Sequence, residues 1–150
     1  MIEIVSQQID EQAALESVKT SQSGAAVLFV GTTRQFTDSK ETLRLNYDCY
    51  EEMALKVLSD LREQAMTRWP LNGCAIIHRV GVVEVGQASI AVAVSSPHRI
   101  DSFQAVSWLM DQVKERVPVW KQENWADGSR EWIHPGVDSG SGRITSSGDQ

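Results

Sequence analysis

Two segments with apolar residues at helical spacing, each stopped by a proline, limit the folds open to this chain. The first covers residues 53–69 and stops at Pro70, and the second covers residues 100–117 and stops at Pro118. The apolar stretches around them are only four to eight residues long, which is the usual length of a strand. The chain therefore folds from a few helices separated by short strands.

Placing every segment in order gives a mixed architecture. We expect strands at 2–5, 25–31, 43–49, 74–80 and 88–95, a first helix at 10–19 capped by Asp10, and a final hairpin of 120–125 and 130–133 turning at Asp127 and Gly128. The order is βαββαββαββ. Hairpins outnumber parallel crossovers, so the sequence predicts an α+β fold with a mainly antiparallel sheet.

The chain reads as one body followed by a tail. One hundred and fifty residues is the usual size of a single domain. From residue 137 onward the chain is rich in glycine, serine and aspartate and has almost no apolar residue. We therefore expect one domain over residues 1–136 and a disordered tail over residues 137–150.

Composition excludes several classes of function. The net charge of −6 argues against general nucleic-acid binding, because no basic stripe dominates. No apolar run is long enough to span a bilayer and no signal-peptide pattern is visible, so we expect a cytoplasmic protein with no membrane contact. Cys49 and Cys74 lie in strand-like apolar patterns and favour buried thiols over a disulfide or a metal site.

Lys114 occupies an unusual place on the second long helix. The apolar stripe of this helix consists of Phe103, Val106, Met110, Val113 and Val117. Lys114 projects within about 20° of Phe103, at the edge of that stripe. A partly buried lysine there would bind an anion or give up its proton easily, and both suit catalysis. The simpler alternative is a lysine that buries its stem and keeps its ammonium in water.

Two further polar clusters stand at strand ends. Thr32, Thr33 and Arg34 follow the apolar strand directly after Gly31, and the arginine offers a planar fork for phosphate or carboxylate. An ordinary loop arginine is the alternative. The segment 95–99 (SSPHR) precedes the Lys114 helix, where free backbone N–H groups, His98 and Arg99 would favour an anion. There the alternative is a simple turn with Asp101 as the helix cap.

Together these clusters predict a focused anion site in an acidic chain. His78 is a weaker candidate, because it lies near a strand end where it would be exposed. The sequence contains no P-loop and no nucleophile elbow, and its histidines and cysteines show no metal-ligand spacing, so we expect no metal and no cofactor.

Several motifs carry a family resemblance. They are residues 29–34 (FVGTTR), 47–53 (YDCYEEM), 77–81 (IHRVG), 96–99 (SPHR) and 114–123 (KERVPVWKQE), followed by Trp132. In this order they resemble the large, catalytic subunit of molybdopterin synthase, the MoaE family. The resemblance covers about residues 25–135. It implies an α/β-hammerhead fold, and a homodimer at the centre of a heterotetramer with a small ubiquitin-like sulfur-carrier subunit.

The resemblance also implies an activity in molybdenum cofactor biosynthesis. Sulfur would pass from the thiocarboxylated C-terminus of the carrier to cyclic pyranopterin monophosphate, forming the dithiolene of molybdopterin. Lys114 and Lys121 would be the catalytic residues. The substrate would be bound by Thr32, Thr33, Arg34, His98, Arg99, Gln122 and Glu123, with His98 and Arg99 coming from either protomer.

Two other interpretations remain open. The chain would fit a non-catalytic paralogue that binds a sulfur-carrier tail or a phosphorylated ligand without turnover. It would also fit an unrelated phosphate-ester enzyme that uses the same cationic pocket and needs no carrier protein.

Overall fold

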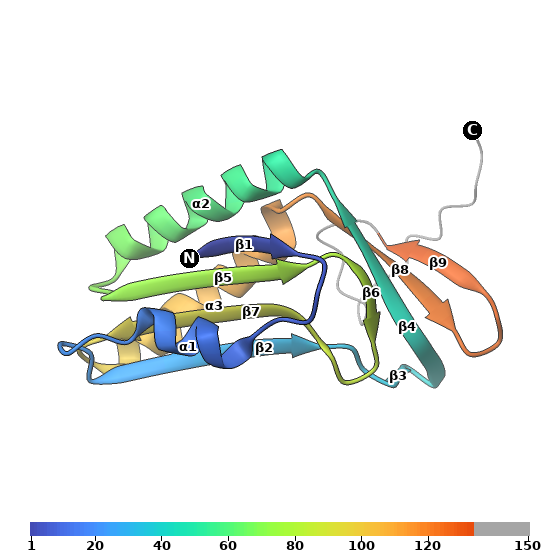
Figure 1. The fold of residues 1–150 in the computed structure, drawn as a ribbon, viewed down its shortest axis with the longest axis horizontal. Helices are drawn as coiled ribbons and strands as arrows, with labels where there is room; N and C mark the ends of the chain where they lie inside the picture. Colours follow the sequence, from blue (N-terminus) through green and yellow to red (C-terminus); the bar gives the residue numbers. More distant parts are fainter. Residues whose placement is uncertain (134–150) are drawn as a thin grey trace.

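The computed structural model describes residues 1–133 of the chain. Its elements are β1 (Ile2–Val5), α1 (Glu11–Val18), β2 (Ala25–Thr32), β3 (Phe36–Thr37), β4 (Lys40–Cys49), α2 (Glu51–Arg68), β5 (Gly73–Arg79), β6 (Gly81–Glu84), β7 (Ala88–Ser96), α3 (Arg99–Arg116), β8 (Val119–Trp125) and β9 (Arg130–Ile133). Figure 1 shows them along the long axis of the molecule, with the three helices at one end and β8 and β9 at the other.

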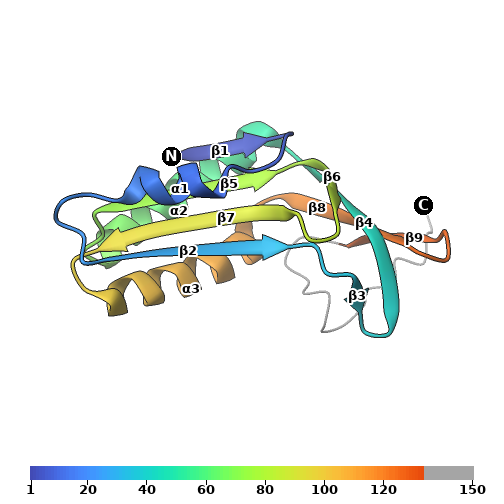
Figure 2. The same ribbon diagram turned by 60° about the horizontal axis from the view of Figure 1, so that its bottom comes forward.

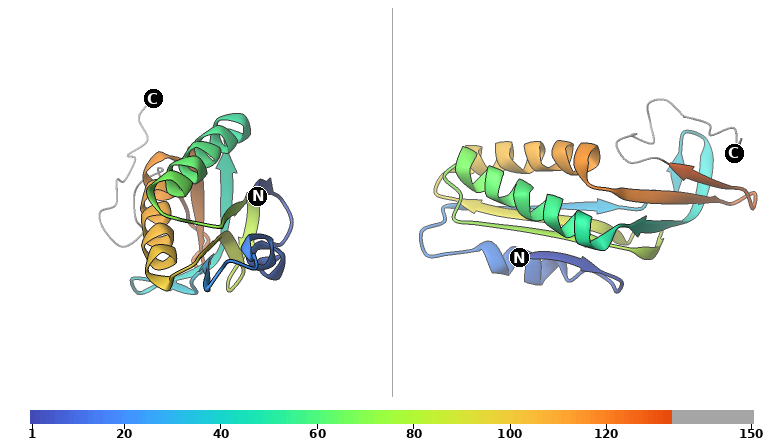
Figure 3. Two further views of the ribbon diagram at one scale, coloured as in Figure 1. Left: turned by 90° about the vertical axis from the view of Figure 1, so that its left-hand side faces the viewer. Right: turned by 90° about the horizontal axis from the view of Figure 1, so that it is seen from above.

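The first sheet forms the centre of the helical end. Its strand order is β1-β5-β7-β2, in which only the β1–β5 pair is parallel. Helices α2 and α3 cover one face and α1 covers the other (Figures 2 and 3). All nine residues of β7 are buried, as expected for a central strand covered on both faces. The main core therefore lies between this sheet and the α2–α3 pair.

The second sheet leaves the helical body at one end. Its order is β3-β4-β8-β9, and β6 also pairs with β4. Strand β4 is ten residues long and leads directly into α2, whereas β8 directly follows α3. The two long helices are therefore tied to neighbouring strands of one sheet. This places the C-terminal end of α3 at the junction of the two sheets.

The structure confirms the α+β class and the mainly antiparallel pairing. Asp10 caps α1 as predicted, since its side chain accepts a hydrogen bond from the N–H of Ala13 at 2.9 Å. The predicted order lacked β3 and β6, which have two and four residues. Strands this short carry too few residues for alternation to be visible. The predicted domain end at residue 136 and the tail 137–150 lie outside the described residues.

The apolar face of α3 differs from the prediction. Phe103 is 56% exposed, and the buried residues are Ser102, Ala105, Val106, Leu109 and Val113. Small residues at 102 and 105 allow the helix to approach the sheet closely, and the hydroxyl groups of Ser102 and Ser96 form a hydrogen bond. The buried face is therefore rotated away from Phe103. Lys114 is exposed as a result, so the burial expected for it was wrong.

Two smaller expectations concern the cysteines and the membrane. Cys74 is buried, whereas Cys49, the last residue of β4, is only partly buried. The prediction of two buried thiols was therefore right for Cys74 and wrong for Cys49. Both are free thiols. None of the helices within residues 1–133 combines the length and the apolar character that crossing a membrane requires.

Candidate functional site

A cavity of about 420 Å³ lies where the two sheets meet. The ends of β2, β5 and β7 that face the second sheet contribute to its wall, as does the last part of α3. The opposite wall is formed by β4, β8 and β9. Residues as far apart in the sequence as Phe29 and Ile133 thus converge on one space.

Three cationic side chains line this cavity. They are Lys114 in the last turn of α3, Lys121 on β8, and Arg34 in the segment after β2. Pro118 separates the helix from the strand, so the two lysines approach the cavity from different elements. The carbonyl end of α3 also favours a cation, and Lys114 and Arg116 occupy that turn.

Glu123 provides a carboxylate among these cations. Its side chain is only 2% exposed, and Oε2 accepts a hydrogen bond of 3.1 Å from Oγ1 of Thr42. Burial raises the pKa of Glu123, while Lys121, Thr42 and Arg34 act in the opposite direction. Because burial has the larger effect, this carboxyl group holds a proton more readily than an exposed glutamate does.

Strand register explains which side chains reach the cavity. Tyr47 on β4 pairs with Lys121, and Leu45 pairs with Glu123. Paired residues share a face of the sheet, and successive residues alternate between faces. Gln122 therefore points to the face opposite that of Lys121 and Glu123, and it is not among the residues that line the cavity.

Tyr47, His78 and Ser89 are neutral polar residues of the cavity wall. The rings of Tyr47 and His78 meet edge to face with centroids 5.4 Å apart. His78 was expected to be exposed at its strand end, and this was wrong: it is 7% exposed, because β1 and β7 flank β5 on either side. Burial lowers the pKa of His78 to about 4, so the imidazole is neutral.

The apolar part of the wall explains Gly31. A Cβ added at Gly31 would lie 2.8 Å from Cγ2 of Ile90 and 3.4 Å from the ring of Phe29, and both residues line the cavity. The glycine is therefore required for close packing of the wall. Its neighbour Thr32 lines the cavity as well.

Five of the nine residues predicted for the site line the cavity, namely Thr32, Arg34, Lys114, Lys121 and Glu123. Thr33 is buried beside it instead, where its N–H donates to the carbonyl of Gln87 and its own carbonyl accepts from the N–H of Gly86. The contacts predicted for Thr33 and Gln122 thus stay predictions.

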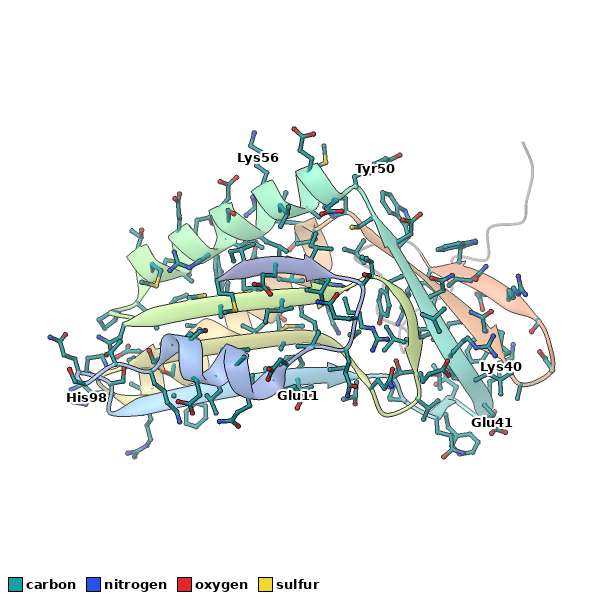
Figure 4. All side chains as sticks on the ribbon, in the orientation of Figure 1. Glu11, Lys40, Glu41, Tyr50, Lys56 and His98 are labelled. Atoms are coloured by element: carbon teal, nitrogen blue, oxygen red, sulfur yellow. The ribbon has the colours of Figure 1, made fainter. Side chains whose placement is uncertain are left out.

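His98 and Arg99 lie at the other end of the molecule. His98 is the N-cap of α3 and Lys114 is in its last turn, so about 24 Å of helix separates them. Figure 4 shows His98 at the end of the molecule opposite Lys40 and Glu41, which lie on β4. Both His98 and Arg99 are exposed. They do not reach the cavity of their own chain. His98 caps without a side-chain hydrogen bond, and Asp101 is in the first turn and is not the cap.

Sequence reasoning missed Tyr47, Ser89 and Thr42 as cavity residues. Tyr47 and Thr42 lie on β4, whose alternation looks like ordinary half-buried sheet, and Ser89 lies on the fully buried strand β7. For Tyr47 and Thr42 the signal is the cross-strand register with β8, which becomes visible only when β4 and β8 are paired. Ser89 lies on β7, which pairs with β2 and β5, so its place depends on how the two sheets meet. Within residues 1–133, no group of three or more His, Cys, Asp or Glu side chains is arranged to hold a metal ion.

The fold and the cavity together define a class of protein. It is an α+β protein whose cationic cavity contains one buried carboxylate and is suited to group transfer between anionic reactants. Residues 4–116 match the family model described as MoaE protein. The chain belongs to the MoaE family.

Individual relatives from distant organisms support the same family assignment. The molybdopterin synthase catalytic subunit of Bacillus subtilis is 37% identical over 131 residues, which cover 87% of this chain and 83% of the relative. That of Emericella nidulans is 40% identical over 143 residues, covering 95% of this chain and 73% of the relative. The crystal structure of molybdopterin synthase from Staphylococcus aureus superposes with a TM-score of 0.83 at 34% identity, covering 87% of this chain and 95% of that one.

Proposed function

We propose that this chain is the catalytic subunit of a molybdopterin synthase and transfers sulfur to cyclic pyranopterin monophosphate. The donor is the C-terminal thiocarboxylate of a small ubiquitin-like sulfur-carrier subunit, and the product is the dithiolene of molybdopterin. The observation that carries the proposal is the convergence of Lys114, Lys121 and Arg34 with Glu123 in one cavity. Family membership supports the same activity.

The reactants explain why this cavity is cationic. A thiocarboxylate and a cyclic phosphate are both anions, so they repel one another unless positive charge lies between them. Three cations around a partly enclosed space hold the two together and reduce that repulsion. Each sulfur that leaves the carrier is replaced there by an oxygen atom from water, so the carrier ends as an ordinary carboxylate.

The residues divide by role. Lys114 and Lys121 are the catalytic residues, which bind the thiocarboxylate and stabilise the negative charge that develops on oxygen. Arg34 and Thr32 bind the phosphate. Glu123, whose pKa is raised by burial, attracts Lys121 and Arg34 and exchanges a proton with the reacting groups.

A second copy of the chain supplies His98 and Arg99. These residues are exposed and about 24 Å along α3 from Lys114 of their own chain, so within one chain they cannot bind the same small substrate. In a homodimer the N-terminal end of α3 from one protomer reaches the cavity of its partner. With one carrier per cavity the assembly is a heterotetramer.

The reaction takes place in the cytoplasm. Cys49 and Cys74 are both free thiols, which suits a reducing compartment. A thiocarboxylate donor also survives better where oxidants are scarce.

A single-turnover assay tests the proposal. The purified chain is mixed with thiocarboxylated carrier and cyclic pyranopterin monophosphate, and dithiolene formation is followed. Wild type should give product, and Lys114→Ala and Lys121→Ala should each lose activity by about a hundredfold or more. Lys56→Ala is the matched control, because Lys56 is an exposed lysine on the outer side of α2 (Figure 4).

Other outcomes separate the alternatives. Tight carrier binding without product from wild type would indicate a non-catalytic paralogue. Consumption of a phosphate ester in the absence of any carrier would indicate an unrelated phosphate-ester enzyme. Full activity of Lys114→Ala at saturating carrier would show that the role given to Lys114 is wrong.

A further inference from the structure

The segment that follows β2 is held by the turn between β6 and β7. Thr32 and Arg34 both line the cavity, whereas Thr33 between them does not and is 3% exposed. The N–H of Thr33 donates to the carbonyl of Gln87 at 3.1 Å, and its carbonyl accepts from the N–H of Gly86 at 2.9 Å. Figures 1 and 2 show this turn beside the chain that leaves β2. Both backbone groups of Thr33 are therefore fixed by the turn.

The side chain of Gln87 fixes the turn itself. Its Oε1 accepts a hydrogen bond of 3.0 Å from Nη1 of Arg79 and one of 3.4 Å from the backbone N–H of Glu84. The backbone N–H of Gln87 donates to the carbonyl of Glu84 at 3.0 Å. One amide oxygen thus joins the turn to Arg79, the last residue of β5. The carbonyl of Gln87 is therefore presented to Thr33 in one orientation.

Arg79 connects this turn to the cavity wall. Its carbonyl oxygen lies 2.8 Å from Nδ1 of His78, which donates to it because a carbonyl can only accept, and His78 lines the cavity. Among residues 1–133, the guanidinium of Arg79 makes one hydrogen bond, to Gln87, and its Nε is buried without a partner. Loss of Gln87 would therefore leave this guanidinium unsatisfied.

Thr33 depends on the turn as well. Its Oγ1 is the other buried side-chain atom without a partner in the described part of the chain. The side chain therefore contributes no hydrogen bond, and the two backbone bonds to Gly86 and Gln87 hold the residue in place. Arg34 follows Thr33 directly. The turn thus fixes the backbone on one side of Arg34.

We propose that Gln87 and Arg79 are positioning residues that set the place of Arg34 in the cavity. This inference rests on the proposed function, in which Arg34 binds the phosphate, and it adds two residues that do not themselves line the cavity. The contacts run from Arg79 through the side chain of Gln87 to the backbone of Thr33. A displacement of about 1 Å transmitted along this path is enough to weaken the use of a bound substrate by up to about a hundredfold.

The contacts confine the effect to one side of the cavity. The hydrogen bonds of Gln87 join β5, the turn and the segment after β2, whereas Lys114 and Lys121 lie on α3 and β8. Loss of Gln87 should therefore displace the phosphate-binding group and leave the two lysines in place. In the sulfur-transfer assay we expect KM to rise more than kcat falls.

Hydrogen exchange of backbone amides tests the positioning directly. Gln87→Leu removes the acceptor oxygen and keeps a side chain of similar size. In the full chain, the amides of Thr33 and Gly86 should then exchange about tenfold faster than in wild type, measured by NMR, and the amides of α3 should be unchanged. Gln87→Glu keeps an acceptor opposite Arg79 and should exchange as wild type does. Gln64→Leu is the matched control, because Gln64 is exposed on α2.

A binding measurement shows whether the effect passes through Arg34. Cyclic pyranopterin monophosphate is titrated into the full chain by calorimetry without carrier, so that no turnover occurs. Gln87→Leu should weaken binding by about tenfold, but by less than about twofold when Arg34→Ala is also present. Arg79→Met breaks the same hydrogen bond from its other end and should weaken binding to the same extent. The variant carrying both Gln87→Leu and Arg79→Met should be no weaker than either single variant.

Two results would overturn the proposal. One is unchanged exchange at Thr33 in both Gln87→Leu and Arg79→Met. The other is equal weakening of binding with and without Arg34→Ala, which would mean that Gln87 supports the fold in general and does not act on Arg34.

The outcomes also separate this inference from the proposed function. If Gln87→Leu loosens Thr33 and weakens binding through Arg34 but wild type forms no dithiolene, the positioning role is correct and the sulfur-transfer function is wrong. If wild type forms dithiolene and Gln87→Leu behaves as Gln64→Leu does, only the positioning role is wrong.

Discussion

Oγ1 of Thr42 donates a hydrogen bond of 3.1 Å to Oε2 of Glu123, and so links β4 to β8 beneath the cavity. In the strand register Thr42 pairs with Trp125, and the register shifts between Thr42 and Arg44. Glu123 is two positions from Trp125, so Thr42 and Glu123 are diagonal neighbours on one face of the sheet. The carboxylate is thus held by the sheet, and its position relative to Lys121 is fixed before any ligand binds.

Removing this hydrogen bond should reveal a coupling between the two residues. Thr42→Val keeps the shape of the side chain and leaves a buried carboxylate oxygen without its donor, so we expect a loss of about 1–2 kcal/mol in the free energy of unfolding. A double-mutant cycle with Glu123→Gln, measured by urea denaturation, should give a coupling energy of about 1 kcal/mol. Strict additivity of the two single changes would contradict the link.

Glu123 should make stability depend on pH. Burial raises the pKa of Glu123 in the folded state, so folding favours the protonated form. Its contribution is therefore favourable below the pKa of the unfolded chain and is lost as pH rises through the folded pKa. The melting temperature of Glu123→Gln minus that of wild type should therefore be larger at pH 7 than at acidic pH.

Thermal melts of both proteins between acidic and neutral pH measure this difference. Glu41→Gln serves as the control, because Glu41 is an exposed glutamate on β4 (Figure 4). A melting-temperature difference between Glu123→Gln and wild type that stays constant with pH would contradict the prediction.

His78 should change the stability of the fold with pH in the direction opposite to Glu123. Burial lowers the pKa of His78 from 6.5 to about 4, so between these values the unfolded chain takes up a proton and the folded chain does not. The contribution is present above pH 6.5 and is lost as pH falls toward 4, with a total of roughly 3 kcal/mol. In His78→Gln this part of the acid destabilisation should be absent.

The difference between the variant and wild type isolates the histidine from the carboxylates that titrate in the same range. Urea denaturation of both proteins at several pH values gives this difference. If wild type and His78→Gln lose stability in parallel between pH 6.5 and 4, His78 is not buried and neutral as described.

The fold was largely predictable because its longer elements carry local signals. Pro70 and Pro118 mark the ends of the long helices, Asp10 marks the start of α1, and the turn at Asp127 and Gly128 joins β8 to β9. Strand β6 has no comparable signal. Gly81 turns the chain with a φ of +84°, and the four residues of β6 then pair with β4, whose sequence is more than thirty positions earlier. Such pairing is decided by tertiary contacts.

The site was predictable in its charges but not in its neutral groups. Arg34 and Lys114 were identified because cations near strand and helix ends stand out in an acidic chain, and Lys121 was identified through the family resemblance. The reason given for Lys114 was nevertheless wrong, since the helix turns its small residues to the sheet and leaves the lysine at the cavity. His78 was underrated, because its burial depends on β1 and β7, which flank it from distant parts of the sequence.

The last prediction concerns how two chains share one site. If Arg99 acts in the cavity of the partner protomer, a heterodimer of a Lys114→Ala chain with an Arg99→Ala chain contains one intact site and one site that lacks both residues. Two inactive variants should therefore recover about half of the wild-type activity when they are combined in one dimer. The reverse experiment pairs a chain carrying both substitutions with a wild-type chain, and each of its two sites then lacks one residue. Activity should be recovered in the first dimer and lost in the second. The opposite result would mean that Arg99 serves the cavity of its own chain, which the length of α3 between Arg99 and Lys114 argues against.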